Sequence, residues 1–312
     1  MASKTILSVV DPTADEQPAV ERAAWLATQV GASLELFVCD DAPDSPGRPV
    51  EPARLEQARE AALDRHRERL SELAARLSAG GLDVTVDARW GRPLDRGIVA
   101  KVVDAEPLLV VKDTHYHTGL KRTLFTNTDW SLIRSCPAPL LLVKPRPIAA
   151  EPIVLAAVDP LHEHDKPAEL DRAILAFAKE LTGALHGQLH VHHSFDIGPV
   201  LAAIAGTPAS TMAVPVEEIA QAAEAEHRKA LEKLVSDFDI EPSRLHLEQG
   251  VPHEALVAQA EALGADIVVM GAVSRSGLKR IFVGSTAERA LDRLPCDLLV
   301  IKPPAFTLSD HR

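Results

Sequence analysis

The sequence predicts two consecutive doubly wound α/β domains, each a five-stranded parallel sheet with helices on both faces. The first observation behind this prediction is an internal repeat. TILSVVDP (5–12) returns as IVLAAVDP (153–160), and PAPLLLVKP (137–145) returns as PCDLLVIKP (295–303). Further matching segments lie between these in the same order, so the repeated unit is a whole domain and not a short motif.

The second observation is the alternation of short apolar runs with helical patterns. In the first half, strands are expected near 5–10, 34–39, 82–87, 107–111 and 139–143, with helices at 15–30, 53–79, 94–104 and 127–135. In the second half, strands are expected near 152–158, 188–194, 244–248, 266–270 and 297–301, with helices between them. Continuous apolar strands separated by helices are typical of a parallel sheet covered on both faces. Ligands of such sheets bind beyond the carboxyl ends of the strands, where the strand order reverses.

The boundary between the two copies is placed at the Pro- and Ala-rich stretch RPIAAEP (146–152), so the expected domains are 1–147 and 151–306. The separation of equivalent residues grows from 148 (Asp11 to Asp159) to 161 (Leu70 to Leu231). The extra residues are assigned to the apolar stretch 196–215. This stretch is interpreted as a lid, as the wall of an apolar pocket or, the favoured alternative, as a loop packed on the other domain.

The amino-acid composition and net charge argue against several classes of binding protein. The chain has 312 residues, of which 46% are apolar and 4% aromatic, and a net charge of −12. The negative charge argues against general binding of nucleic acids or anionic membranes, and the few aromatics argue against a base-stacking platform. The three cysteines form no CxxC pair, which favours a reducing compartment. No apolar run approaches the ~20 residues that span a bilayer, and the N-terminus lacks a signal-peptide pattern, so a cytoplasmic location is expected.

A candidate phosphate site follows the fourth strand of the second half. Gly271 comes directly after the apolar run ADIVVM (265–270), and Gly284-Ser285-Thr286 opens an expected helix that ends near Leu294. The start of a helix offers unpaired backbone N–H groups and the positive end of the helix dipole. Glycine allows the backbone to approach an anion closely, and a hydroxyl adds a donor.

These motifs and the full-length repeat resemble the tandem universal stress proteins, in particular those of the UspE type, over nearly the whole chain. The family pattern is G-x2-G-x9-G-[S/T] after a strand. Here it reads Gly271-x2-Ser274-x9-Gly284-Ser285, with serine in place of the second glycine. The resemblance implies a fold like that of the adenine nucleotide α-hydrolases. It also implies that the second domain binds ATP or a related adenine nucleotide, with Mg²⁺ on the phosphates.

The resemblance also implies a role for each matching residue. Asp159, after the first strand of the second half, would contact the adenosine, and Val191, on the second strand, would flank the adenine. Met270 is also expected to bind the nucleotide, and the residues expected around the phosphates are Gly271, Ser274, Gly284, Ser285 and Thr286.

The first half departs from this pattern. Asp113, Tyr116, Thr126 and Asn127 stand where the second half has Gly271, Ser274, Gly284 and Ser285. An acidic and a bulky side chain at these positions would repel and crowd a phosphate. The first domain is therefore expected to have lost nucleotide binding, with Asp11 keeping a structural role.

Histidines suggest a second kind of site. His190 and His192 share one face of a strand because side chains alternate, and His246 is expected on a neighbouring strand. Three imidazoles with an open position would suit zinc. The alternative is a set of scattered, partly exposed histidines, and the sequence favours that alternative.

The favoured function is therefore a non-enzymatic stress-response protein whose second domain binds ATP. By the resemblance, the two domains would pair within the chain as single-domain relatives do in dimers, and a further homodimer is possible. One alternative is slow ATP hydrolysis, although no residue stands out as an activator of water. Another is a nucleotide-free scaffold or a carrier of a small apolar ligand.

Overall fold

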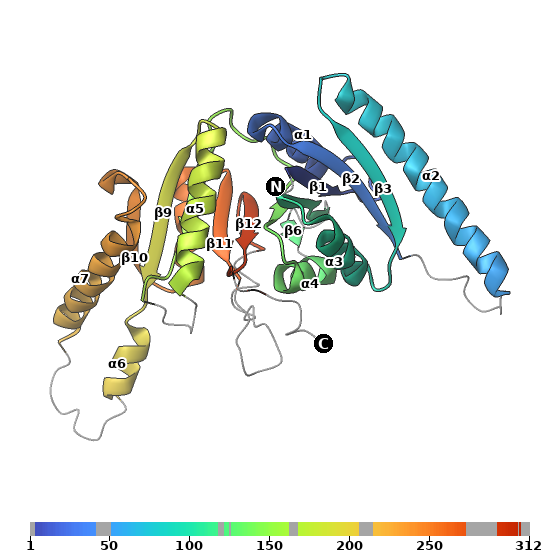
Figure 1. Cartoon of the computed structure of the whole chain (residues 1–312). Helices are drawn as coiled ribbons and strands as arrows, with labels where there is room; N and C mark the ends of the chain where they lie inside the picture. The colour runs from blue at the N-terminus through green and yellow to red at the C-terminus, as the bar shows by residue number, and fades with distance from the viewer. Residues whose placement is uncertain are drawn as a thin grey trace. The chain divides into compact units, whose positions relative to one another are not determined.

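The computed structural model describes residues 4–41, 51–117, 122–124, 126–161, 168–205, 215–272, 292–304 and 306. The chain divides into two compact units (Figure 1). Unit 1 comprises Met1–Pro147 together with Phe306, and unit 2 comprises 148–304. Within the described residues, no helix has both the length and the apolar character that crossing a membrane requires.

Unit 1 contains one parallel sheet with strand order β3-β2-β1-β4-β7. Its strands are β1 (Thr5–Val9), β2 (Ser33–Asp40), β3 (Val84–Trp90), β4 (Leu109–Asp113) and β7 (Leu140–Val143). Its helices are α1 (Pro18–Val30), α2 (Pro52–Ser78), α3 (Leu94–Ala105) and α4 (Asn127–Ser135). Helices α1 and α2 cover one face, and α3 and α4 cover the other.

Unit 2 repeats this topology with strand order β10-β9-β8-β11-β12. Its strands are β8 (Ile153–Ala157), β9 (Gln188–Phe195), β10 (Leu245–Gln249), β11 (Ile267–Gly271) and β12 (Asp297–Ile301). Its helices are α5 (Ala168–Ala184), α6 (Gly198–Ala205), α7 (Val216–Val235) and α8 (Pro252–Leu263), with a 3₁₀ turn at Pro242–Arg244. The predicted fold class, a doubly wound five-stranded parallel sheet in each half, is confirmed.

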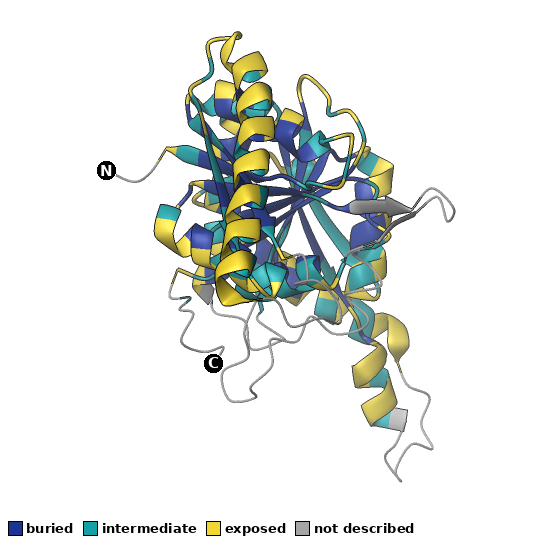
Figure 2. Ribbon diagram, turned by 90° about the vertical axis from the view of Figure 1, so that its right-hand side faces the viewer, coloured by how far each residue is buried: buried dark blue, intermediate teal, exposed yellow. Residues whose placement is uncertain are grey.

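Local sequence explains these elements. The central strands are apolar on both faces because helices cover both, and every residue of β7 and β12 is buried. Figure 2 shows dark blue, buried residues along the strands in the interior. Helix α1 begins with Pro18 in its first turn and ends at Gly31, whose φ of 63° gives a left-handed C-terminal cap. Helix α8 uses the same pair of signals, Pro252 and Gly264.

A short hairpin in unit 1 differs from the prediction. No strand was expected between 111 and the helix at 127–135, but β5 (His115–His117) pairs antiparallel with β6 (Arg122–Leu124). These three-residue strands are too short and too polar to give the periodic signal on which strand prediction depends.

The extra residues of unit 2 are also distributed differently from the prediction. Strand register aligns Phe37 with His192, a separation of 155, so part of the increase from 148 to 161 precedes β9. The predicted loop 196–215 begins as helix α6, and residues 206–214 lie outside the described part of the chain. The assignment of all the extra residues to 196–215 was therefore wrong.

Candidate functional site

In unit 1, a cavity of about 330 Å³ lies at the predicted ligand position, beyond the carboxyl ends of β1, β2 and β4. Apolar residues such as Val9, Val10 and Ile98 line it. Four aspartates, Asp11, Asp40, Asp41 and Asp113, line it as well. The lining is therefore unfavourable for a polyphosphate.

The start of helix α4 in this cavity already holds an internal anion. Asp129 is fully buried, and its Oδ2 accepts hydrogen bonds from the backbone N–H (2.8 Å) and the hydroxyl (2.9 Å) of Thr126. Its Oδ1 accepts a hydrogen bond from Lys112 Nζ at 2.8 Å. A carboxylate and its own cation thus occupy the positive end of the helix, where a phosphate would otherwise bind.

Asp113 also has a partner within unit 1. Its Oδ1 accepts a hydrogen bond from the backbone N–H of Ala19 at 2.6 Å, which satisfies a donor of the first turn of α1.

Cys39 lines the same cavity, but burial, followed by the negative charges of Asp41 and Asp40, raises the pKa of its thiol to about 12. This thiol is protonated at neutral pH and is not a nucleophile.

In unit 2, the described residues of the predicted site are Asp159, Val191, Met270 and Gly271. Asp159 follows β8 and is partly exposed, and its N–H donates to Asp171 Oδ1 of α5 at 3.1 Å. Met270 and Gly271 end β11 and are also partly exposed. Ser274, Gly284, Ser285 and Thr286 lie outside the described residues.

Gly271 has a packing role that the sequence did not reveal. A Cβ at this position would lie 2.6 Å from Leu170 Cδ2 and 3.1 Å from Ile174 Cδ1 of helix α5. The missing side chain therefore makes room for α5, whereas the equivalent Asp113 of unit 1 bonds to the start of α1.

The expectation for Val191 is wrong. Val191 is fully buried and pairs with Ala156 of β8 and Leu245 of β10, in the middle of the sheet. Its side chain cannot reach a ligand beyond the strand ends. Ser194 and Phe195 occupy the end of β9 instead, where Cys39 and Asp40 end β2.

Comparison with known proteins decides the family. Residues 2–144 and 153–302 each match the universal stress protein family. The chain belongs to this family. Universal stress protein E of Escherichia coli strain K12 is 31% identical over 97% of this chain and 95% of its own length. The universal stress protein E homolog of Haemophilus influenzae is 26% identical over 97% of this chain and 98% of its own. The predicted likeness to tandem, UspE-type proteins is confirmed.

Solved structures show the same fold over nearly the whole chain. A functionally unknown protein from Pseudomonas aeruginosa PAO1 has a TM-score of 0.74 and 27% identity, covering 97% of this chain and 93% of that chain. A universal stress protein from Archaeoglobus fulgidus has a TM-score of 0.67 at 18% identity, covering 97% of this chain and all of that one, and this likeness concerns the fold.

The three histidines considered as candidates for a zinc site do not form one. His190 Nδ1 and His246 Nε2 share a hydrogen bond of 2.9 Å, and their rings stack 5.2 Å apart. These nitrogens face each other and do not converge on a common point. His192 is buried, and neither of its ring nitrogens has a hydrogen-bond partner. No group of three metal-binding side chains occurs in the part of the chain that the structure describes.

A second pair of histidines was missed by the sequence analysis. His193 Nε2 lies 2.8 Å from His227 Nδ1, and both side chains are buried between β9 and α7. The repeat contained a signal for this site, because His227 aligns with His66 of unit 1. His66 instead bonds to Asp40 Oδ2 at 3.0 Å, so equivalent histidines have different partners in the two universal stress protein domains.

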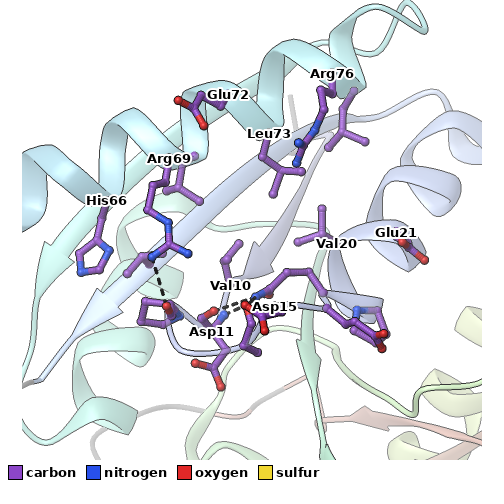
Figure 3. A pocket seen from close by; sticks show the side chains of 18 residues that line it. Val10, Asp11, Asp15, Val20, Glu21, His66, Arg69, Glu72, Leu73 and Arg76 are labelled. Carbon is purple, nitrogen blue, oxygen red and sulfur yellow. Dashed lines mark hydrogen bonds between the residues drawn. The ribbon is translucent and has the colours of Figure 1, made fainter.

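A larger cavity of about 800 Å³ lies between α1 and α2 of unit 1 (Figure 3). Val10, Val20 and Leu73 line it, and Arg69 and Arg76 extend over it from α2. The carboxylates around it are Asp11, Asp15, Glu16, Glu21 and Glu72. Since its lining carries charges of both signs, this cavity does not select one class of ligand.

Proposed function

We propose that unit 2 binds ATP or a related adenine nucleotide, with a divalent cation such as Mg²⁺ on its phosphates. The site lies at the carboxyl ends of β8, β9 and β11. The binding residues are Asp159, Met270, Gly271, Ser274, Gly284, Ser285 and Thr286. The protein acts as a ligand-dependent regulator or scaffold in the stress response, without turnover of the nucleotide.

The observation that carries this proposal is an internal ion pair of unit 1 whose two residues are replaced by uncharged ones in unit 2. In unit 1, Lys112 and Asp129 fill the start of α4. Strand register and the repeat place Met270 and Ala287 at these positions in unit 2. The aligned positions of unit 2 therefore have neither the carboxylate nor the lysine.

Substitutions around the site also lower its negative charge. Asp113 of unit 1 corresponds to Gly271, and Asp40 corresponds to Phe195. Two of the four carboxylates that border the cavity of unit 1 are thus replaced by uncharged residues. A polyanion is less strongly repelled at this place in unit 2 than in unit 1.

Isothermal titration calorimetry with Mg-ATP tests the site. Gly284→Val adds a branched side chain where the backbone must approach the phosphates, and we expect at least about a tenfold loss of affinity, equivalent to one lost charge-assisted hydrogen bond. Gly183→Val is the matched control, because Gly183 lies in α5 with no atom within 4 Å of an added Cβ. If Gly284→Val binds ATP as tightly as the parent does, the site assignment is wrong.

The absence of turnover is tested separately by a phosphate-release assay. The parent and an Asp159→Ala variant should both release phosphate at the rate of the buffer control. Release that depends on Asp159 would make the protein an ATPase and would contradict the regulatory role proposed here.

One observation favours a second candidate function, a carrier of small apolar ligands. Helix α6 has the apolar sequence GPVLAAIA, and Val200 is 49% exposed on it. Mass spectrometry of small molecules released from freshly purified protein distinguishes the two functions. An adenine nucleotide supports the first function, and an apolar molecule supports the second.

A further inference from the structure

The peptide group that joins Val158 to Asp159 is held from both sides by buried side chains of unit 2. Its carbonyl oxygen, on Val158, accepts a hydrogen bond from His193 Nδ1 at 3.1 Å. Its N–H, on Asp159, donates to Asp171 Oδ1 at 3.1 Å. His193 is 2% exposed and Asp171 is fully buried. Together they set the plane of the peptide from which the Asp159 side chain extends.

The hydrogen bonds determine which nitrogen of His193 carries the hydrogen. A carbonyl oxygen only accepts, so His193 Nδ1 is the donor to Val158. In the neutral ring Nε2 is then an acceptor, and His227 Nδ1 must donate to it across 2.8 Å. Phe195 stacks on the ring of His227 with centroids 4.7 Å apart, which helps to orient it. A chain of two hydrogen bonds thus runs from α7 to the end of β8.

The described residues of unit 1 do not repeat this arrangement. Val38 occupies the position of His193, so the imidazole is replaced by an apolar side chain there. The N–H of Asp11 donates to Gln17 Oε1 at 3.3 Å, and His66 bonds to a carboxylate. The imidazole pair therefore occurs in the unit for which nucleotide binding is proposed.

We propose that the His193–His227 pair positions Asp159 for the nucleotide and releases it when the pair is doubly protonated. This inference rests on the proposed function, since it concerns the same site. In the neutral pair, one of the two facing nitrogens donates a hydrogen bond and the other accepts it. After one proton is added, one facing nitrogen still donates and the other still accepts. A second proton places hydrogens on both facing nitrogens, so the rings must separate and the bond to Val158 is lost. Acid then weakens nucleotide binding in unit 2.

The groups that face His193 determine the pH range in which it becomes protonated. Burial, followed by the positive charge on His227, lowers the pKa of His193 to about 4, while the carboxylates of Asp159 and Asp171 act in the opposite direction. His192, the next residue on β9, is also buried, and its pKa is lowered to about 4. On β10 the residue paired with His193 is the apolar Leu247. His193 is therefore neutral at pH 7.5 and becomes protonated as the pH falls toward 4.

NMR of the ligand-free protein tests the positioning without any nucleotide. We expect the Asp159 amide resonance of the parent to shift between pH 7.5 and pH 3.5 as its peptide is released. His227→Gln should abolish most of this shift, because a Gln side chain can donate to neutral His193 or, turned over, accept from protonated His193. His186→Asn is the control, since His186 is exposed and Asn tolerates its φ of 52°. Equal shifts in the parent and in His227→Gln would overturn the proposal.

Calorimetry with Mg-ATP at the same two pH values tests the consequence for binding. The parent should lose about fourfold more affinity on acidification to pH 3.5 than His227→Gln does, because about three quarters of His193 is protonated there. A common loss in both would reflect protonation of the nucleotide itself. His193→Val, which introduces the unit 1 residue, should bind weakly at pH 7.5 with little further change. Equal acid losses in the parent and His227→Gln overturn the inference. If ATP does not bind at any pH, the proposed function fails, and the amide shifts still decide whether the pair positions Asp159.

Discussion

Lys112 and Asp129 show how one pair of residues distinguishes two copies of the same domain. The pair is almost completely buried in unit 1, and both members make further hydrogen bonds, to the Asp113 carbonyl and to Thr126. A buried pair of this kind does little for stability by itself, but a single buried charge left behind is costly. In unit 1 the carboxylate of Asp129 takes the place that a bound anion would have at the start of α4, and Lys112 supplies the positive charge that balances it.

Asp129→Ala should destabilise unit 1 by about 3 kcal/mol, because it leaves Lys112 buried without its carboxylate. Lys112→Met combined with Asp129→Ala, which introduces the unit 2 residues, should recover most of that loss. Urea unfolding followed by tryptophan fluorescence measures this, since Trp25, Trp90 and Trp130 all lie in unit 1. If the double variant is as unstable as the single variant, the two residues do not act as a pair.

At the scale of elements, the packing of α5 on β11 depends on Gly271. Leu170 of α5 occupies the space that a side chain at this position would need. In the family pattern this glycine belongs to the nucleotide motif, yet in this chain its nearest neighbours are protein side chains. The two roles are compatible, and they can be separated by measuring stability and binding in the same variants.

Gly271→Ala should lower the free energy of unfolding of unit 2 by about 1–3 kcal/mol, because the added Cβ lies too close to Leu170. Far-UV circular dichroism during urea unfolding measures the loss, since tryptophan fluorescence reports only on unit 1. Adding Leu170→Ala should restore part of the stability by removing the clash. No loss in Gly271→Ala would show that α5 does not need the glycine.

The elements were also the features that the sequence predicted best. Strand β1 was expected at 5–10 and is found at Thr5–Val9, because a continuous apolar run between turn residues gives a strong strand signal. The hairpin β5–β6 and helix α6 were missed. One is too short for a periodic signal, and the other lies in a stretch that is apolar on all sides.

The candidate site was predicted less completely, for reasons that involve side-chain packing. Asp159, Met270 and Gly271 are found at the expected strand ends. The adenine contact was assigned to Val191, but strand register places this residue in the middle of the sheet. The His193–His227 contact joins a strand to a helix that lies 34 residues further along the chain. Periodicity along the sequence does not reveal such a contact, although the alignment of His227 with His66 pointed to the position.

At the scale of the whole molecule, the two universal stress protein domains differ in their response to acid. Burial is the first cause that lowers the pKa of His192 and of His193 to about 4, and it also lowers the pKa of His190 and His246. All four residues lie in unit 2. A histidine whose pKa is lower in the folded state binds protons more readily when unfolded, so stability is full above pH 6.5 and falls as the pH drops toward 4.

Unit 2 should therefore unfold at a lower urea concentration at pH 5.0 than at pH 7.5. Its free energy of unfolding should fall by about 2 kcal/mol for each of His192 and His193. Circular dichroism should show this early transition while tryptophan fluorescence, which reports on unit 1, changes later. His192→Phe provides the sharpest comparison, because Phe37 occupies the equivalent position in unit 1. The variant should lose about half of the acid sensitivity, since it keeps the apolar packing and removes one buried imidazole. An acid response that is equal in the two units, or unchanged in His192→Phe, would mean that the buried histidines do not determine it.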